Sequence, residues 1–509
     1  MKDSPNRCSL AGCFAFAICF VVACEQVALA QIKDFKDPAP PTVATLREVE
    51  TPKAVDYEPV KFHSAPKPLA EGAVTHDWVN FLGPTHNSVS TETKLLKKFP
   101  AGGPKIVWEL TRGDGYSSPG IQGDYLVYPH RVGNETIVEC LHPRTGKKYW
   151  EFKFPTDYSD RYGYGSGPRA SPVIHDGRVY IYSAKGELFC LKLTTGQVYW
   201  QRKLLEELQV PQDFFGSAQT PLLEGDLLIM NVGARGGPCV VAVHRLTGKI
   251  VWATGDKWGP SYASATPSDI HGKRRVFVFA GGDSDPPTGG LMSIDPASGA
   301  VDFEFPFRSK SYESVNASCP VVIGNSVFIS ATYKTGSAFL AIKDDFSYDP
   351  IWQIPDDQNN RRRNGLGLHW NTAVYDKGYF YAFDGRNEPD ASIACVDAKT
   401  GKVVWREEPE WDETVTINGM ERTFTLSTLR GTLLKVDGNY LALGEYGHLL
   451  WLDLTPQGYK QIDRATLFLA QQSWAVPVLS HGLLYVTQNQ REMVKRTPRK
   501  LYCYDLRGK

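Results

Sequence analysis

One short motif recurs along this chain and constrains the fold more than any other feature. A Gly lies four residues before a large aromatic residue in five copies, which end at Trp150, Trp200, Trp252, Phe303 and Trp405. Diverged copies end at Trp352 and Ile462. A tight hairpin turn needs a residue that tolerates positive φ, and Gly supplies it. The motif therefore predicts a turn followed by a strand that carries an aromatic side chain.

The other end of the repeating unit gives its length. Six units have a Pro four or five residues before the first hairpin turn, and Ala373 and Leu433 hold that place in two more. The six are Pro119, Pro172, Pro221, Pro267, Pro320 and Pro477. Successive units start about 51 residues apart, and four short strands with their turns need roughly 40 to 50 residues. We therefore predict an all-β, eight-bladed β-propeller.

The two ends of the repeat region complete each other. After Pro477 the chain has only three predicted strands, whereas the strand around Trp108 has no three strands before it. If this N-terminal strand joins the last blade, an exposed sheet edge disappears and the ring is closed. The alternative is that Trp108 begins a separate small domain. We expect the closed ring, with the propeller spanning residues 77–509.

The N-terminus has the features of a secretory signal. Basic residues precede the apolar run from Leu10 to Cys24, and Ala28-Leu29-Ala30 follows as a cleavage site. The run is shorter than the roughly 20 residues that span a bilayer. We predict a signal peptide over residues 1–30 and, because residues 31–76 are rich in Pro and charge, an extended tether after it. The end of the run also resembles a lipobox, so a lipid on Cys24 is the alternative to soluble release at Gln31.

Charge and cysteine content narrow the functional classes. The chain has 56 basic and 56 acidic side chains, which argues against a non-specific nucleic-acid binder. It contains none of the short motifs that mark nucleophile elbows, zinc proteases or phosphate-binding loops. Six Cys lie beyond the signal segment without a paired pattern, so we predict small buried residues rather than disulfides.

The A-x-x-x-T-G-x-x-x-W unit, repeated after a secretory signal, resembles the pyrroloquinoline-quinone (PQQ)-like propeller repeat. The resemblance covers roughly residues 77–509, and residues 77–90 look like the opening of exported bacterial PQQ-like proteins. It implies an extracytoplasmic protein of the periplasm or cell envelope. The family includes quinoprotein dehydrogenases and cofactor-free members such as the BamB assembly lipoprotein, so the repeat supports the fold more than the chemistry.

The expected ligand site is the mouth of the central channel. Propellers bind ligands with the loops that lead from each outer strand to the next innermost strand, and here those loops are long and aromatic, including residues 424–430. Residues just before the innermost strands should point toward the axis. The ligand-binding candidates are Arg169, Gln219, His369, Trp370, Asn371, Arg430 and Trp474. Arg169 is the first candidate for an anionic group because its guanidinium is a planar fork of donors; for His369 and Trp370 the alternative is a plugged channel.

The enzymatic branch of the family implies a more demanding site. It implies a quinone beside Ca²⁺ held by a carboxylate and an amide, an Asp base, an aromatic floor and usually a disulfide between adjacent Cys. Glu313 with Asn316 or Asn371 are the candidate metal ligands, and Trp370 or Trp474 the candidate floor. The sequence has no adjacent Cys pair and offers no base that we can name.

We therefore predict a non-catalytic, monomeric propeller that binds a cell-envelope protein or polymer through this mouth. We expect no cofactor, no nucleic-acid partner and no membrane contact other than a lipid on Cys24. The alternative is a PQQ- and calcium-dependent periplasmic dehydrogenase of alcohols or sugars. A carbohydrate-binding module is the third hypothesis, since aromatic loops also stack on sugar rings.

Overall fold

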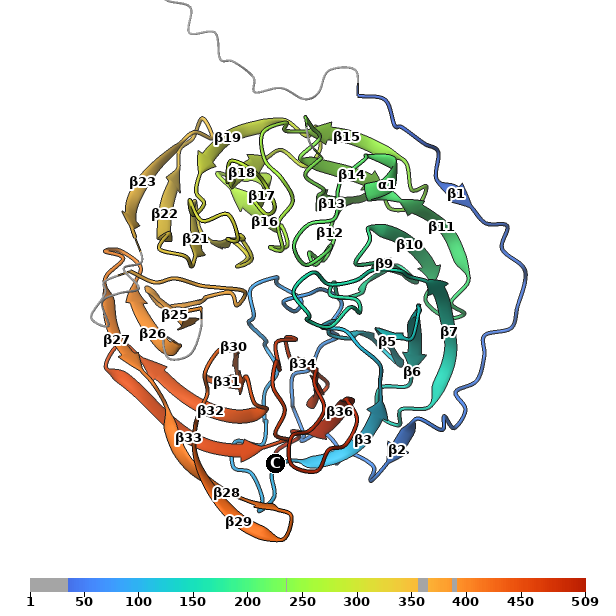
Figure 1. Cartoon of the computed structure of the whole chain (residues 1–509), viewed down its shortest axis with the longest axis vertical. Coiled ribbons are helices and arrows are strands. Elements are labelled where there is room, and N and C mark those ends of the chain that lie inside the picture. Colours follow the sequence, from blue (N-terminus) through green and yellow to red (C-terminus); the bar gives the residue numbers. More distant parts are fainter. Residues whose placement is uncertain (1–34, 235, 356–364, 387–390) are drawn as a thin grey trace, which may run out of the picture.

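Eight small antiparallel sheets surround a common axis (Figure 1). The computed structural model describes residues 35–234, 236–355, 365–386 and 391–509. The eight-bladed propeller predicted from the repeat is confirmed. The predicted signal peptide (residues 1–30), the start at Gln31 and the lipid site at Cys24 lie outside the described residues.

The first four blades follow one another in the chain, and each runs from an innermost to an outermost strand. Blade 1 consists of β4–β7 (Gly120–Gln122, Tyr125–Val132, Glu135–Leu141, Lys148–Pro155), and blade 2 of β8–β11 (Val173–His175, Arg178–Tyr182, Glu187–Lys192, Val198–Lys203). Blade 3 consists of β12–β15 (Leu222–Glu224, Leu227–Asn231, Val240–His244, Ile250–Thr254), and blade 4 of β16–β19 (Thr266–Ile270, Lys273–Ala280, Gly290–Ile294, Val301–Pro306). A four-residue helix, α1 (Leu204–Glu207), follows blade 2.

The last four blades continue the ring. Blade 5 is β20–β23 (Val321–Ile323, Ser326–Ala331, Gly336–Ile342, Tyr348–Ile354), blade 6 is β24–β27 (Val374–Asp376, Tyr379–Asp384, Ser392–Asp397, Val403–Glu407), blade 7 is β30–β33 (Gly431–Val436, Asn439–Gly444, His448–Thr455, Gly458–Thr466) and blade 8 is β34, β35, β36 and β3 (Val478–Ser480, Leu483–Thr487, Lys500–Asp505, Lys105–Thr111). In blade 8 the N-terminal strand β3 pairs with the C-terminal strand β36, and Trp108 lies opposite Cys503.

The repeated aromatic residue joins each blade to the next. In six blades the indole N–H of the outer-strand Trp donates a hydrogen bond to a carbonyl in the hairpin turn of the following blade. The pairs are Trp108–Pro143, Trp150–Leu193, Trp200–Arg245, Trp252–Pro296, Trp352–Ala398 and Trp405–Thr455, all between 2.7 and 3.0 Å. In each pair the accepting residue stands three positions before the Gly of that turn.

The six cysteines beyond the signal segment are all buried and free. They lie in or beside the sheets, as their spacing predicts. Burial raises the pKa of each resolved thiol, Cys140 and Cys503 included, so these groups are neutral fillers between blades.

The segment of residues 77–90 lies across the central opening of the ring (Figure 1). Trp78 exchanges backbone hydrogen bonds with Ile121 of β4, and the carbonyl of Val79 accepts from the N–H of Ile174 in β8. On the other side of the axis, Val89 forms a parallel bridge with Lys435 of β30. Since these contacts reach blades 1, 2 and 7, the segment closes one end of the central channel.

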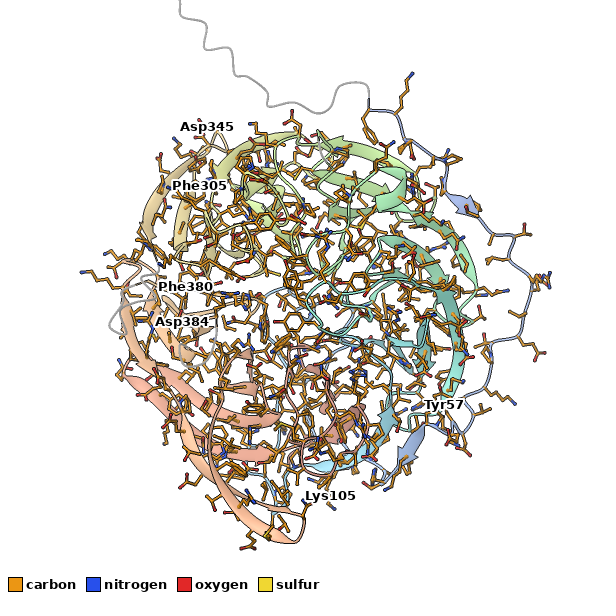
Figure 2. All side chains as sticks on the ribbon, in the orientation of Figure 1. Tyr57, Lys105, Phe305, Asp345, Phe380 and Asp384 are labelled. Carbon is orange, nitrogen blue, oxygen red and sulfur yellow. The ribbon has the colours of Figure 1, made fainter. Side chains whose placement is uncertain are left out.

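Residues 35–68, the N-terminal strap, lie extended along the outside of the ring. Within the strap, β1 (Thr42–Val43) adds a strand to β11 and β2 (Val60–Phe62) adds one to β3. Asp37 binds the guanidinium of Arg202, which has no exposed surface, and Tyr57, at the outer edge in Figure 2, donates a hydrogen bond to Glu139. The segment for which we predicted a tether is thus described, from residue 35 on, as a strap packed against three blades. No helix among the described residues has the length and apolarity to cross a membrane.

A two-stranded ribbon stands outside the eight blades. This arm consists of β28 (Glu410–Ile417) and β29 (Met420–Ser427), and it lies beside the outer strands of blade 7 (Figure 1). The expected mouth loop of residues 424–430 is therefore largely strand: Phe424 to Ser427 belong to β29 at the periphery, and only the last residues reach the axis. The alternation of apolar residues across Val415, Ile417, Phe424 and Leu426 suits this ribbon.

Candidate functional site

A pocket of about 210 Å³ lies on the ring axis, and every blade contributes to it. Its lining residues come from the segments that lead into the innermost strands, as expected for a propeller mouth. Seven of them are aromatic: Phe81, Tyr116, Tyr164, Phe215, Tyr262, Trp370 and Trp474. Phe81 belongs to the segment that crosses the channel, so this segment forms the inner wall of the axial pocket.

The position of these residues follows a rule of register. The residue three places before the repeat Pro, or before its substitute, is Tyr116 in blade 1, Arg169 in blade 2, Trp370 in blade 6, Arg430 in blade 7 and Trp474 in blade 8. All five line the axial pocket, and so do the small residues at this place in blades 3 and 5. Because backbone geometry repeats from blade to blade, the residue at this position points to the axis in each of these seven blades.

The aromatic rings contact one another in a continuous row. Trp474 stacks on Tyr116 with the ring centroids 5.6 Å apart, and its other contacts are Tyr164 at 5.5 Å and Trp370 at 6.3 Å. Phe215 continues the row, 5.8 Å from Tyr164 and 5.5 Å from Tyr262. Tyr164 is 38% exposed, which places it at the rim of the pocket.

Arg169 and Arg430 reach the pocket with their charges already paired. Arg169 donates to Asp160 at 2.7 Å, to the carbonyls of the loop before β8, and lies over Tyr116. Arg430 holds Glu445 through two hydrogen bonds of 2.8 and 2.5 Å. Both carboxylates are buried. The guanidinium groups therefore position the aromatic rings, and neither is free to hold an anion as the sequence predicted for Arg169.

Two polar atoms in the axial pocket have no hydrogen-bond partner. They are the Nε1 of Trp370 and the Nδ1 of His369, both buried. Burial lowers the pKa of His369 to about 3, and the positive charges of Arg430 and Arg386 act in the same direction. His369 is therefore neutral at physiological pH. Both polar atoms lie beneath the surface of the pocket, so its wall presents the rings of Trp370 and His369 rather than their free polar atoms.

Gln219 and Asn371 stand in the same segments but lie behind the pocket wall. The side-chain amide of Gln219 accepts from the backbone N–H of Asn231 at 2.8 Å and donates to its carbonyl. The amide of Asn371 donates to the carbonyl of Phe383 at 2.6 Å. Each ties the start of an innermost strand to the second strand of its own blade. Side chains one or two places closer to the strand than the pocket residues thus hold the blade together.

The residues predicted for a calcium site do not come together as a ligand set. Glu313 is exposed, whereas Asn316 is buried and its amide donates to the carbonyls of Ala280 and Phe307. Within the described residues, no three His, Cys, Asp or Glu side chains cluster in a way that could hold a metal ion. Asp160 and Glu445 are bound to the two arginines of the pocket, and Asp213 interacts with Tyr262 of its wall. The donor set present does not fit the quinone and Ca²⁺ that the dehydrogenase branch would place here.

Sequence reasoning found part of the aromatic wall only at the level of loops. Tyr164, Phe215 and Tyr262 lie in long aromatic loops expected at the mouth, although they were not named as candidates, whereas Tyr116 and Phe81 were missed. The register relative to the repeat Pro would have found Tyr116. No periodic signal marks Phe81, because it lies in the segment before the repeats.

A larger cavity of about 1020 Å³ opens beside the axis among the loops of blades 1 to 4. It is lined by polar groups that bind each other: Arg131 donates to the carbonyl of Ser166 and Lys185 pairs with Asp157. Burial raises the pKa of Asp213 in its wall to about 6. Three of its lining residues also carry a buried polar atom without a hydrogen-bond partner among the described residues: Tyr182, Asp213 and Asn231. The aromatic residues gather in the axial pocket instead, where all eight blades contribute, and we take that pocket as the candidate site.

Comparisons with known proteins agree with this architecture. A family model described as outer membrane protein assembly factor BamB matches residues 134–388. Among solved structures, BamB from Moraxella catarrhalis is 14% identical, covers 79% of this chain and 99% of its own, and gives a TM-score of 0.51. A quinohemoprotein alcohol dehydrogenase from Comamonas testosteroni is 13% identical over 85% of this chain and 81% of its own, with a TM-score of 0.55.

A europium-containing methanol dehydrogenase is 11% identical over 84% of this chain and 98% of its own, with a TM-score of 0.56. No curated protein sequence matches the chain. At such identities the likeness to solved structures concerns the fold alone, and both the assembly factor and the dehydrogenases share it.

Proposed function

The chain belongs to the PQQ-like repeat family, and from this premise we propose that it is a non-catalytic, extracytoplasmic propeller that binds a protein or polymer partner of the cell envelope at its axial pocket. The observation that carries the proposal is the state of the pocket's charged groups. Asp160 and Glu445 are held by Arg169 and Arg430. No carboxylate in the lining is free to act as a base, while seven aromatic rings offer a binding surface.

Aromatic and Arg side chains are the usual anchors of protein interfaces, because they bury much apolar area at a small entropic cost. In the axial pocket the rings are held by polar contacts at their edges: Trp474 donates to Glu445 at 2.9 Å and Tyr116 donates to Gln472 at 2.5 Å. Rings fixed in this way are preorganised, so a partner that covers them orders few groups on binding.

One observation favours the quinoprotein dehydrogenase as a second candidate. Trp370 and Trp474 both line the axial pocket, with their ring centroids 6.3 Å apart, and indole rings in a pocket wall suit a planar quinone. To separate the two functions, the purified chain is incubated with PQQ and Ca²⁺ and assayed for dye reduction with alcohols and sugars. We expect neither PQQ binding nor turnover; saturable turnover would establish the dehydrogenase instead.

The binding function is tested by photocrosslinking in the producing cells. A crosslinking amino acid replaces Tyr164 at the rim of the pocket, and in a control chain it replaces Val251, which is 53% exposed on the outer strand β15. We expect a discrete adduct from position 164 that the control lacks. The adduct should disappear when Trp370→Ala and Trp474→Ala are added. Equal adducts from both positions, or none from position 164, would exclude the axial pocket as the interface.

A further inference from the structure

The axial pocket is electrically balanced. Its two guanidinium groups each bind a buried carboxylate, Asp160 for Arg169 and Glu445 for Arg430, and His369 is neutral because burial lowers its pKa to about 3. A charged ligand group would lose its hydration here without gaining a free opposite charge. The group that enters the pocket is therefore uncharged.

The pocket also makes few hydrogen bonds. Among the buried side-chain polar atoms of its described lining, only Trp370 Nε1 and His369 Nδ1 lack a partner, and both lie beneath the pocket surface. A pyranose ring carries several hydroxyl groups, and each one buried without a partner costs about 1–3 kcal/mol. This wall would leave most of them unpaired. A sugar ring thus fits the polar side of the pocket poorly, even though its apolar face would stack on Trp474.

The size of the pocket limits the ligand further. At about 210 Å³ it is smaller than the roughly 300–1,000 Å³ of pockets that enclose whole small molecules. Only one small group of a larger partner can enter it. The rings of Tyr116, Trp474 and Tyr164 follow one another at 5.5–5.6 Å and form walls for a flat, apolar ring.

A prolyl residue meets all these requirements. Its side chain is a compact, uncharged ring without polar atoms, and Pro-rich segments adopt the polyproline II conformation, in which backbone carbonyls have no internal partner. Aromatic-lined grooves are a general receptor for polyproline II segments, whose fixed backbone keeps the entropic cost of binding low.

We propose that the axial pocket binds a Pro-rich, uncharged segment of a partner polypeptide, with a prolyl ring against Tyr116, Tyr164 and Trp474. This inference rests on the proposed function, and it selects a protein partner over a polysaccharide.

The test uses decaproline as the probe and the full chain without its predicted signal peptide as the receptor. Binding is measured by calorimetry and by quenching of tryptophan fluorescence, with maltoheptaose and a Gly/Ser decapeptide as comparison ligands. We expect saturable binding of decaproline alone. Trp474→Ala removes the ring that contacts both Tyr116 and Tyr164, so affinity should fall about tenfold, the equivalent of roughly 1.4 kcal/mol. Tyr164→Ala should weaken binding as well.

The matched control is Phe62→Ala, which removes an aromatic ring that is 50% exposed on the strap, far from the axis; its affinity should equal that of the unaltered chain. Circular dichroism verifies that each variant is folded. Wild-type affinity in Trp474→Ala would overturn the role of the aromatic wall, and saturation by maltoheptaose instead of decaproline would overturn the ligand class.

The crosslinking and decaproline experiments together distinguish the failure of this inference from the failure of the proposed function. If the crosslinked adduct at position 164 forms and decaproline does not bind, the pocket is an interface and the prolyl assignment is wrong. If the adduct is absent as well, the proposed function itself fails.

Discussion

At the scale of single residues, the turn Gly and the repeated Trp are two halves of one contact. Gly196 has a φ of +72°, and a Cβ placed on it would lie 2.5 Å from the indole of Trp150 in the preceding blade; Gly299 has the same relation to Trp252 at 2.6 Å. In blade 5 both halves of the contact are replaced together. The turn has Phe346 at positive φ instead of Gly, and the preceding blade has Phe303 instead of the Trp that such a Gly would contact. The motif therefore reflects contact between blades as well as turn geometry.

A pair of Gly→Ala variants measures this contact. Gly225 has a φ of +56°, and a Cβ added to it would meet no atom within 4 Å, so Gly225→Ala should cost about 1 kcal/mol for the left-handed backbone alone. Gly196→Ala should cost roughly 1–3 kcal/mol more, because its methyl group displaces Trp150. Urea-unfolding midpoints of the two variants give the comparison. Equal losses would mean that the turn Gly is needed for its backbone conformation only.

At the scale of elements, the arm is attached to blade 7 chiefly through one partly buried carboxylate, that of Glu413. Glu413 of β28 accepts hydrogen bonds from His448 at 2.9 Å and from Thr466 at 2.8 Å, and Arg464 lies over the ring of Trp411. An isolated two-stranded ribbon is marginally stable in water, so these contacts hold the arm in place. The sequence could not show this attachment, because the ribbon has its own turn and alternation but no signal for the blade it joins.

Loss of the Glu413 contacts should release the arm. Burial alone would raise the pKa of Glu413, but the hydrogen bonds from His448 and Thr466 outweigh burial and lower it to about 2. Because the folded pKa lies below the unfolded value of about 4.5, the stabilisation is complete above pH 4.5 and is lost as pH falls toward 2. Glu413→Gln should speed hydrogen exchange of residues 410–427 about tenfold at pH 7, and the gap to the unaltered chain should narrow at pH 3. The exposed Glu421→Gln is the control; if both variants exchange alike, Glu413 does not hold the arm.

At the scale of the whole molecule, some features of the fold follow from local sequence patterns, and others depend on contacts between distant segments. The blades, their number and the residues that face the axis follow from a local pattern that repeats with the register of the Pro. The pairing of Arg169 with Asp160 and of Arg430 with Glu445 depends on how loops meet after the ring forms, so Arg169 was expected to be free. The crossing segment at residues 77–90 and the strap have no repeat at all, and contacts with distant blades position them.

Truncation separates the contributions of the strap and of strand β3. A chain of residues 77–509 loses the strap, and the guanidinium of Arg202, which has no exposed surface, loses Asp37 while it keeps Glu207. We expect this chain to fold as a monomer with a melting temperature lower by on the order of 5 °C, because the remaining carboxylate still pairs the buried charge.

A chain of residues 113–509 also loses the crossing segment of residues 77–90 and β3, and the loss of β3 leaves the buried strand β36 as an unpaired edge. Such an edge pairs with other copies, so this chain should aggregate. Size-exclusion chromatography and thermal melts followed by circular dichroism compare both chains with the intact one, and Asp37→Asn in the full chain isolates the ion pair. If the 113–509 chain is monomeric and melts with the 77–509 chain, the N-terminal strand does not hold the ring together.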